Sequence, residues 1–208
     1  MAEPETELGL ETFPRVIGFL SSLLQRVVES NDDRRLFQSS EKVSVFHGLT
    51  RPTISIRRYL ERIFKYANCS SSCFLVAYVY LDRSVQMKRS LPINFYNVHR
   101  LLITSVLVSA KFMDDMYYNN AYYAKVGGIS TAEMNILELD FLFGLGFQLN
   151  VEPTTFHTYC TLLQREMWMQ IQPPLQHLPQ PSSTIGRSLR IHCCLNEDES
   201  THHHRLAV

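Results

Sequence analysis

Residues 74–81 constrain the fold more than any other stretch of this 208-residue chain. All eight are aliphatic or aromatic, so a helix over them would be apolar nearly all round, as helices in the middle of a domain are. Three serines at positions 70–72 precede this run, separated from it by Cys73, and each of them can cap a helix N-terminus. The run is far too short to span a bilayer. The sequence therefore predicts a buried central helix in a globular domain.

The rest of the body, from residue 13 to about residue 170, also has the apolar spacing of helices, and no stretch alternates as a strand does. Ser55 can cap one helix, and Ser130 with Glu133 has the pattern of a capping box. We therefore expect a compact all-α domain. The predicted helices cover residues 13–28, 55–67, 70–81, 97–111, 130–145 and 153–167. The tyrosine-rich residues 117–123 are interpreted as a loop.

The two ends of the chain differ from this helical body. From Pro173 onward the sequence is rich in proline, serine and glutamine, which is typical of a linker or a disordered tail. The acidic N-terminus lacks the apolar segment of a secretory signal. The cysteines number five, and an odd count without a signal predicts free thiols in a reducing compartment. We expect a protein of the nucleus or cytoplasm that is not secreted.

The charge balance argues against two classes of partner. Lys and Arg together number 20, Asp and Glu together number 20, and the formal net charge is zero. A protein that wraps nucleic-acid phosphates needs a clear basic excess, and so does a polybasic membrane binder. We therefore expect neither a nucleic-acid partner nor a membrane partner.

Sequence signals for catalysis are weak. Gly127 and Gly128 lack the spacing of a phosphate-binding or dinucleotide-binding loop. His157 and Cys160 lie three positions apart on one predicted helix and could form a base and a nucleophile. A cysteine in such a helix is more commonly a small buried side chain. An enzyme built on this pair is therefore the least favoured hypothesis, and no catalytic residue is assigned.

Sequence signals for metal binding are weak as well. Cys69 and Cys73 share a helical face, but no second pair completes a metal site, so a packing role is favoured. A second His/Cys tract, at residues 192–194 and 202–204, belongs to the expected tail and has no folded frame. We therefore expect no metal and no cofactor.

Four charged residues lie among apolar neighbours in the predicted helices, where an unpaired charge is costly. They are Arg57, Asp82, Lys111 and Glu138. One interpretation is that they form intramolecular salt bridges. The other is that Lys111 and Glu138 lie at the rim of an apolar surface that a partner covers, with Phe112, Leu142 and Phe147 as anchors beside them.

Four short motifs in this order and spacing resemble the cyclin box. They are SIR at 55–57, YLDR at 80–83, SAKFMDD at 109–115 and MNILE at 134–138. The box resemblance covers about residues 40–150. Together with the N-terminal helix and the tail, these motifs most resemble the plant P-type cyclins, also called U-type, of the Pho80-like group.

This resemblance implies a five-helix cyclin box preceded by one N-terminal helix. It divides the chain into an N-terminal segment (1–39), the box (40–150), an additional C-terminal helix (151–172) and a flexible tail (173–208). One box is expected, because too few residues follow it for a second one.

The resemblance also implies a function and its residues. Lys111 and Glu138, with Phe112, Leu142 and Phe147, would bind a cyclin-dependent kinase near its regulatory αC helix, whereas Arg57 and Asp82 would form an internal salt bridge. The chain would then be the regulatory subunit of a heterodimer and not itself an enzyme. The process would be cell-division control or phosphate-responsive signalling. The alternative is a cyclin-fold transcription adaptor or scaffold that activates no kinase.

Overall fold

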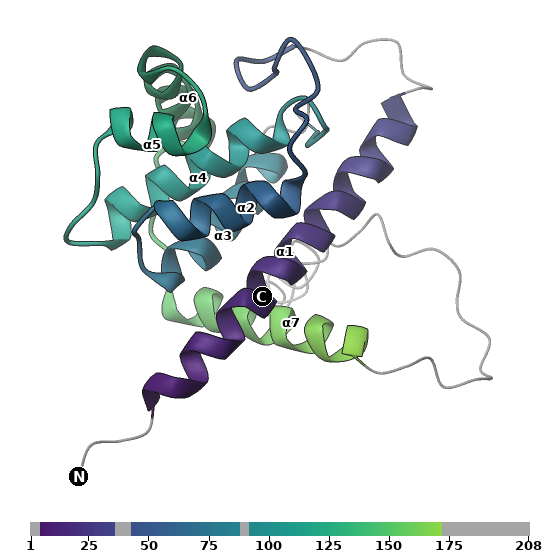
Figure 1. Ribbon diagram of the computed structural model, residues 1–208, viewed down its shortest axis with the longest axis vertical. Coiled ribbons are helices and arrows are strands. Elements are labelled where there is room, and N and C mark those ends of the chain that lie inside the picture. The colour runs from purple at the N-terminus through teal and green to yellow at the C-terminus, as the bar shows by residue number, and fades with distance from the viewer. Residues whose placement is uncertain (1–4, 36–42, 88–91, 172–208) are drawn as a thin grey trace, which may run out of the picture.

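A computed structural model of the chain describes residues 5–35, 43–87 and 92–171. Within these ranges it contains seven helices and no strand, so the all-α prediction is confirmed. Figure 1 labels them along the chain. They are α1 (Glu5–Arg35), α2 (Ile56–Tyr66), α3 (Ser71–Met87), α4 (Val98–Met113), α5 (Asn120–Gly127), α6 (Thr131–Gly144) and α7 (Pro153–Ile171). The predicted tail, with its His/Cys tract at 192–194 and 202–204, lies outside the described residues.

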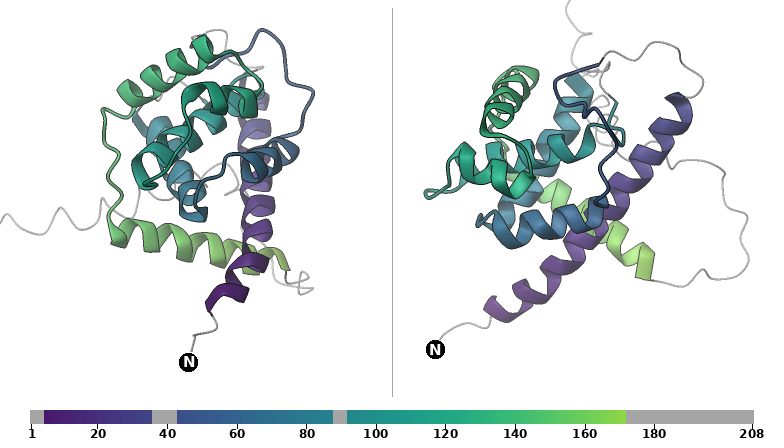
Figure 2. Two further views of the ribbon diagram at one scale, coloured as in Figure 1. Left: turned by 60° about the vertical axis from the view of Figure 1, so that its left-hand side comes forward. Right: turned by 45° about the horizontal axis from the view of Figure 1, so that its top comes forward.

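Helices α3 and α4 pack along each other and form the centre of the domain. Residues 73–82 of α3 and 101–110 of α4 are all buried. Helices α2, α5 and α6 also pack on α4, while α1 and α7 cross on the other side of the bundle (Figures 1 and 2). The apolar run at 74–81 is thus central, as expected, and it shares that position with α4. None of the described helices has the length and apolar character needed to span a membrane.

Helix α5 corrects the prediction of a loop over residues 117–123. The Asn119 side chain caps it by accepting from the Tyr122 amide, and Gly128, at φ +72°, ends it in the left-handed conformation. Tyr123 is fully buried, and its hydroxyl donates to the Ala67 carbonyl over 3.2 Å. The Tyr122 hydroxyl donates to the Tyr66 carbonyl over 2.7 Å. This helix has only eight residues, so tertiary contacts stabilise it. It is also too short to show an apolar periodicity in the sequence.

The predicted salt bridge between Arg57 and Asp82 is not formed. Arg57 lies on the exposed face of α2, where its Nε donates to Glu61 Oε1 over 2.9 Å, one helical turn away. Asp82 is fully buried in α3 and accepts hydrogen bonds from Tyr159 of α7, over 2.6 Å, and from Gln86, over 3.0 Å. A buried carboxylate needs donors, and α7 supplies one where the family resemblance had implied Arg57.

Helix α3 also holds the segment that leads into α7. The Tyr80 hydroxyl donates to the Leu149 carbonyl over 2.7 Å. Arg83 donates through one nitrogen to the carbonyl oxygens of Gln148 and Asn150, each over 2.9 Å. These bonds fix the chain as it leaves α6, and with Tyr159 they attach α7 to the central helix.

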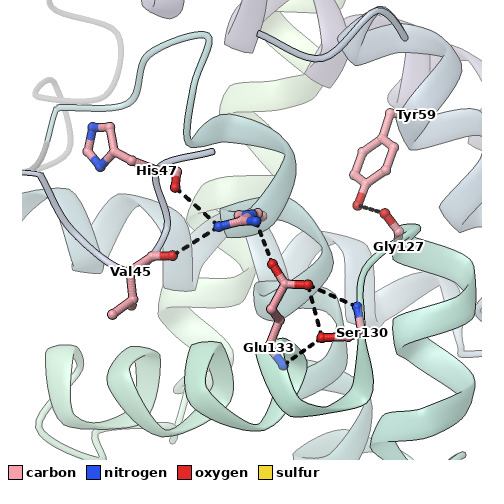
Figure 3. Close-up of polar contacts among 7 residues, drawn as sticks. Val45, His47, Tyr59, Gly127, Ser130 and Glu133 are labelled. Atoms are coloured by element: carbon pink, nitrogen blue, oxygen red, sulfur yellow. Dashed lines mark hydrogen bonds and ion pairs between the residues drawn. The ribbon is translucent and has the colours of Figure 1, made fainter. Parts of the chain in front are cut away.

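Arg100 of α4 joins three parts of the domain. Its Nη1 donates to the carbonyl oxygens of Val45 and His47, and its Nη2 lies 2.6 Å from Glu133 Oε1 (Figure 3). Glu133 also completes the predicted capping box with Ser130, which the structure confirms. One guanidinium thus secures the segment before α2 and the first turn of α6.

Candidate functional site

Lys111 and Glu138 form an ion pair between the last turn of α4 and the middle of α6. The distance from Lys111 Nζ to Glu138 Oε1 is 2.6 Å. The two side chains are 29% and 15% exposed, so the pair lies at the edge of the core rather than on the open surface. The intramolecular interpretation of these two charges therefore holds, and it leaves both groups at a surface that a partner can reach.

Asn120 of α5 completes this polar cluster, and the sequence analysis missed it because it missed the helix. Its Nδ2 donates to Glu138 Oε2 over 2.7 Å and to Asn135 Oδ1 over 2.8 Å. Its own Oδ1 is buried and accepts no hydrogen bond from the described residues. The cluster thus brings together α4, α5 and α6.

An exposed apolar face of α6 lies beside the ion pair. Of the residues expected there, Phe112 and Phe147 are about half exposed and Leu142 is partly buried against the core. The structure adds three exposed apolar side chains that the sequence analysis did not select: Ile136, Leu139 and Phe143. We call these six residues the α6 apolar surface. The sequence of α6 did contain a signal for this surface, because apolar residues occur on its exposed side as well as on its buried side.

Phe147 is held in an uncommon backbone conformation. Its φ is +59°, and the preceding Gly146 has φ +56°. Its amide donates to the Leu142 carbonyl over 3.0 Å, which closes the turn after α6. The Phe147 ring packs edge-on against Phe143 with a centroid distance of 5.2 Å. A left-handed aromatic residue costs of the order of 1 kcal/mol, and strain of this kind gathers at functional sites.

The structure gives the enzyme hypothesis no support. His157 is exposed on α7, while Cys160 is partly buried and packs against the core. Burial raises the pKa of the Cys160 thiol, which disfavours the nucleophilic thiolate. Neither a hydrogen bond nor an ion pair joins the two described side chains.

Cys73 lies in the first turn of α3, whereas Cys69 lies in the connection before it, so the prediction that the two cysteines share a helical face is wrong. The Cys73 thiol is buried and lies 3.4 Å from Asp114 Oδ2, which also accepts from the Ser70 amide over 2.9 Å. In the part of the chain that the structure describes, no group of three or more His, Cys, Asp or Glu side chains could hold a metal ion.

Comparisons with known proteins agree on one family. The family model described as Cyclin matches residues 14–149. Cyclin-U4-1 of Arabidopsis thaliana is 66% identical over 189 residues, which is 90% of each chain. Cyclin-U4-3 of the same plant is 56% identical and covers 94% of this chain and 89% of its own. Cyclin-P4-1 of rice is 53% identical and covers 91% and 86%.

The family model begins within α1, at residue 14, and continues past the end of α6, and the relatives extend the match over most of the remaining chain. Members of this family act as regulators rather than catalysts. The chain therefore belongs to the cyclin family, and within it to the plant P- and U-type cyclins.

Proposed function

We propose that this cyclin binds and activates a cyclin-dependent kinase through the α6 apolar surface and the adjoining Lys111–Glu138 pair. The observation that carries the proposal is the placement of a half-buried ion pair beside exposed aromatic and aliphatic side chains. Contiguous apolar side chains on the surface of a monomer mark interaction sites, and central aromatic anchors dominate the binding energy of protein interfaces.

The polar groups beside this surface retain capacity for a partner. The Lys111 ammonium has three donors, of which the bond to Glu138 uses one. Asn120 Oδ1 is buried and closed to a partner, whereas Lys111 is 29% exposed. A partner helix or loop that covers the surface could supply carbonyl oxygens to Lys111. Such bonds fix the register of the partner, while the apolar contacts supply most of the affinity.

The proposed mechanism is activation without catalysis. A protein kinase needs the ion pair between its β3 lysine and its αC glutamate before phosphoryl transfer proceeds. A rigid surface that fits only the αC-in state shifts the kinase population toward that state. A shift from 1:99 to 99:1 requires about 5.5 kcal/mol of differential binding, and an interface of standard size can provide it.

The experiment mixes the full chain with purified plant cyclin-dependent kinases and measures binding by titration and phosphorylation of a generic peptide. Leu139→Asp tests the apolar surface, because Leu139 is 56% exposed on α6. Leu49→Asp is the matched control, because Leu49 is fully exposed in the segment before α2. We expect Leu139→Asp to abolish binding and Leu49→Asp to leave it unchanged.

A charge swap separates the structural role of the ion pair from its role toward the partner. Lys111→Glu alone breaks the pair, whereas Lys111→Glu with Glu138→Lys restores it in reverse. We expect the double variant to regain thermal stability but not kinase binding. Recovery of binding would show that the pair is only structural. Failure of the native chain to bind any kinase would overturn the proposal, and binding without activation would favour the scaffold alternative.

A further inference from the structure

The exposed face of α2 is strongly basic, although the chain as a whole carries no net charge. Four cations lie on it: Arg57, Arg58, Arg62 and Lys65, all exposed. The opposite face of α2 is buried in the core. Glu61 is the one acidic residue of this helix, and Arg57 already binds it. The other three cations, Arg58, Arg62 and Lys65, therefore face solvent without a carboxylate partner among the described residues.

Helix α5 extends this strip. Arg62 Nη2 donates to the backbone carbonyl of Lys125 over 3.0 Å, so the end of α5 lies against α2. The Lys125 side chain is exposed at this junction. Among the described residues, no carboxylate lies within salt-bridge distance of Arg58, Lys65 or Lys125. We call Arg58, Arg62, Lys65 and Lys125 the basic strip.

We propose that the basic strip binds an acidic segment of a partner protein. This inference goes beyond the proposed function: the strip lies on α2 and α5, whereas the kinase-binding proposal uses α4 and α6. Charge complementarity identifies the partner, since cations that lack a carboxylate partner attract carboxylates and steer their approach. Exposed Phe64 and Tyr66 flank the strip and offer apolar contacts to such a segment.

The spacing of the cations favours a row of carboxylates over one phosphate group. Arg58 to Arg62 is four residues, or about 6 Å along the helix, and Arg62 to Lys65 is about 4.5 Å. Alternate side chains of an extended peptide lie about 6.6 Å apart on one side. A phosphate instead requires several donors that converge on one point. The strip therefore matches glutamates or aspartates at alternate positions of an extended chain.

The test measures binding of a fluorescent peptide with alternating glutamates to the full chain, against the same peptide with glutamines. Arg58→Glu is the first variant. Ser55 caps α2, and its side chain accepts from the Arg58 amide. Glutamate at this position would create a capping box, so loss of binding cannot come from loss of the helix. Lys65→Glu is the second variant. Arg165→Glu, which changes an exposed arginine on α7, is the matched control.

We expect salt-sensitive binding of the glutamate peptide that falls about five- to tenfold in Arg58→Glu and in Lys65→Glu but not in Arg165→Glu. The proposal is overturned if the chain binds the glutamate and glutamine peptides equally well. It is also overturned if Arg165→Glu weakens binding as much as the other two variants do. If duplex DNA displaces the fluorescent peptide as well as the unlabelled glutamate peptide does, the proposal is overturned in favour of a nucleic-acid surface. If only a chain with Glu197→Gln, Asp198→Asn and Glu199→Gln binds, the occupant is this chain's own acidic segment and the partner assignment is wrong. The test needs no kinase, so its result is independent of the proposed function.

Discussion

Tyr159, in the helix that follows the cyclin box, donates its hydroxyl hydrogen to a carboxylate oxygen of Asp82 over 2.6 Å. The same Oδ2 atom accepts from Gln86, while Asp82 Oδ1 is buried and has no hydrogen-bond partner within the described ranges. Burial raises the pKa of Asp82 to about 6, and the two hydrogen bonds offset only part of that effect. Burial and the nearby Asp82 charge also raise the pKa of Tyr159, which keeps its hydroxyl a donor.

Asp82 should make the protein less stable as the pH rises from about 4 to 7. Its pKa in the folded state lies above the ordinary value of 3.8, so the folded state binds this proton more tightly than the unfolded chain. The stabilisation is complete below about pH 4 and is lost as the pH passes 6. Urea unfolding at pH 4.5 and at pH 7 should show that the stability of Asp82→Asn rises relative to the wild type by about 2 kcal/mol between the two pH values. A constant difference between the two proteins would contradict the raised pKa.

Gly127→Ala should destabilise the domain by about 1–3 kcal/mol. A Cβ at this position would lie 2.9 Å from Ile103 Cγ1 and 3.3 Å from the Tyr59 hydroxyl oxygen. Ile103 is fully buried in α4, and the Tyr59 hydroxyl donates to the Gly127 carbonyl, so neither neighbour can move freely. The control is Gly18→Ala in α1, where a Cβ meets nothing within 4 Å. That change should stabilise the helix by about 0.5–1 kcal/mol in the same thermal unfolding experiment.

Arg100→Lys should cost about 1–2 kcal/mol of unfolding free energy although it keeps the charge. A lysine ammonium cannot reach Val45, His47 and Glu133 at once, as the planar guanidinium does. Arg57→Lys is the matched control, because Arg57 makes one exposed contact within its own helix, and it should change stability by less than about 0.5 kcal/mol. Equal effects of the two variants in urea unfolding would mean that the fork geometry of Arg100 contributes nothing.

Phe147→Asn should separate stability from partner binding. Asparagine tolerates a φ of +59° better than phenylalanine does, so the free protein should be as stable as the wild type or slightly more stable. The same change removes a ring of the α6 apolar surface, so kinase affinity should fall about tenfold. The melting temperature checks the stability of the free protein, and a binding titration checks its affinity for the kinase. Unchanged affinity would remove Phe147 from the proposed interface.

Local signals predicted the parts of the fold that depend on neighbouring residues. The Ser55 cap and the Ser130–Glu133 capping box are confirmed, because both are complete within four residues of sequence. The contact between Arg57 and Glu61 was readable in the same way, as a helical pair four positions apart. The family resemblance led instead to Arg57–Asp82, a pairing that the local spacing did not support.

The features that the sequence did not predict depend on where distant segments meet. Asp82 finds Tyr159 at a separation of 77 residues, and only the position of α7 brings them together. Helix α5 is too short to show an apolar periodicity in the sequence, so the position of Asn120 beside Glu138 could not be predicted. The internal pairing of Lys111 with Glu138 was one of two interpretations of their charges. Their role toward a partner stays a prediction.

The pairing of Lys111 with Glu138 also bears on how a partner arrives. Each charge has an opposite charge 2.6 Å away, so the two fields cancel beyond a Debye length of about 8 Å. The pair therefore contributes no long-range attraction, and association through the α6 apolar surface should lie near the unsteered range of about 10⁵–10⁶ M⁻¹s⁻¹ with little dependence on salt. The two charges act only after the surfaces touch, so they select the orientation of the complex and not the rate of encounter.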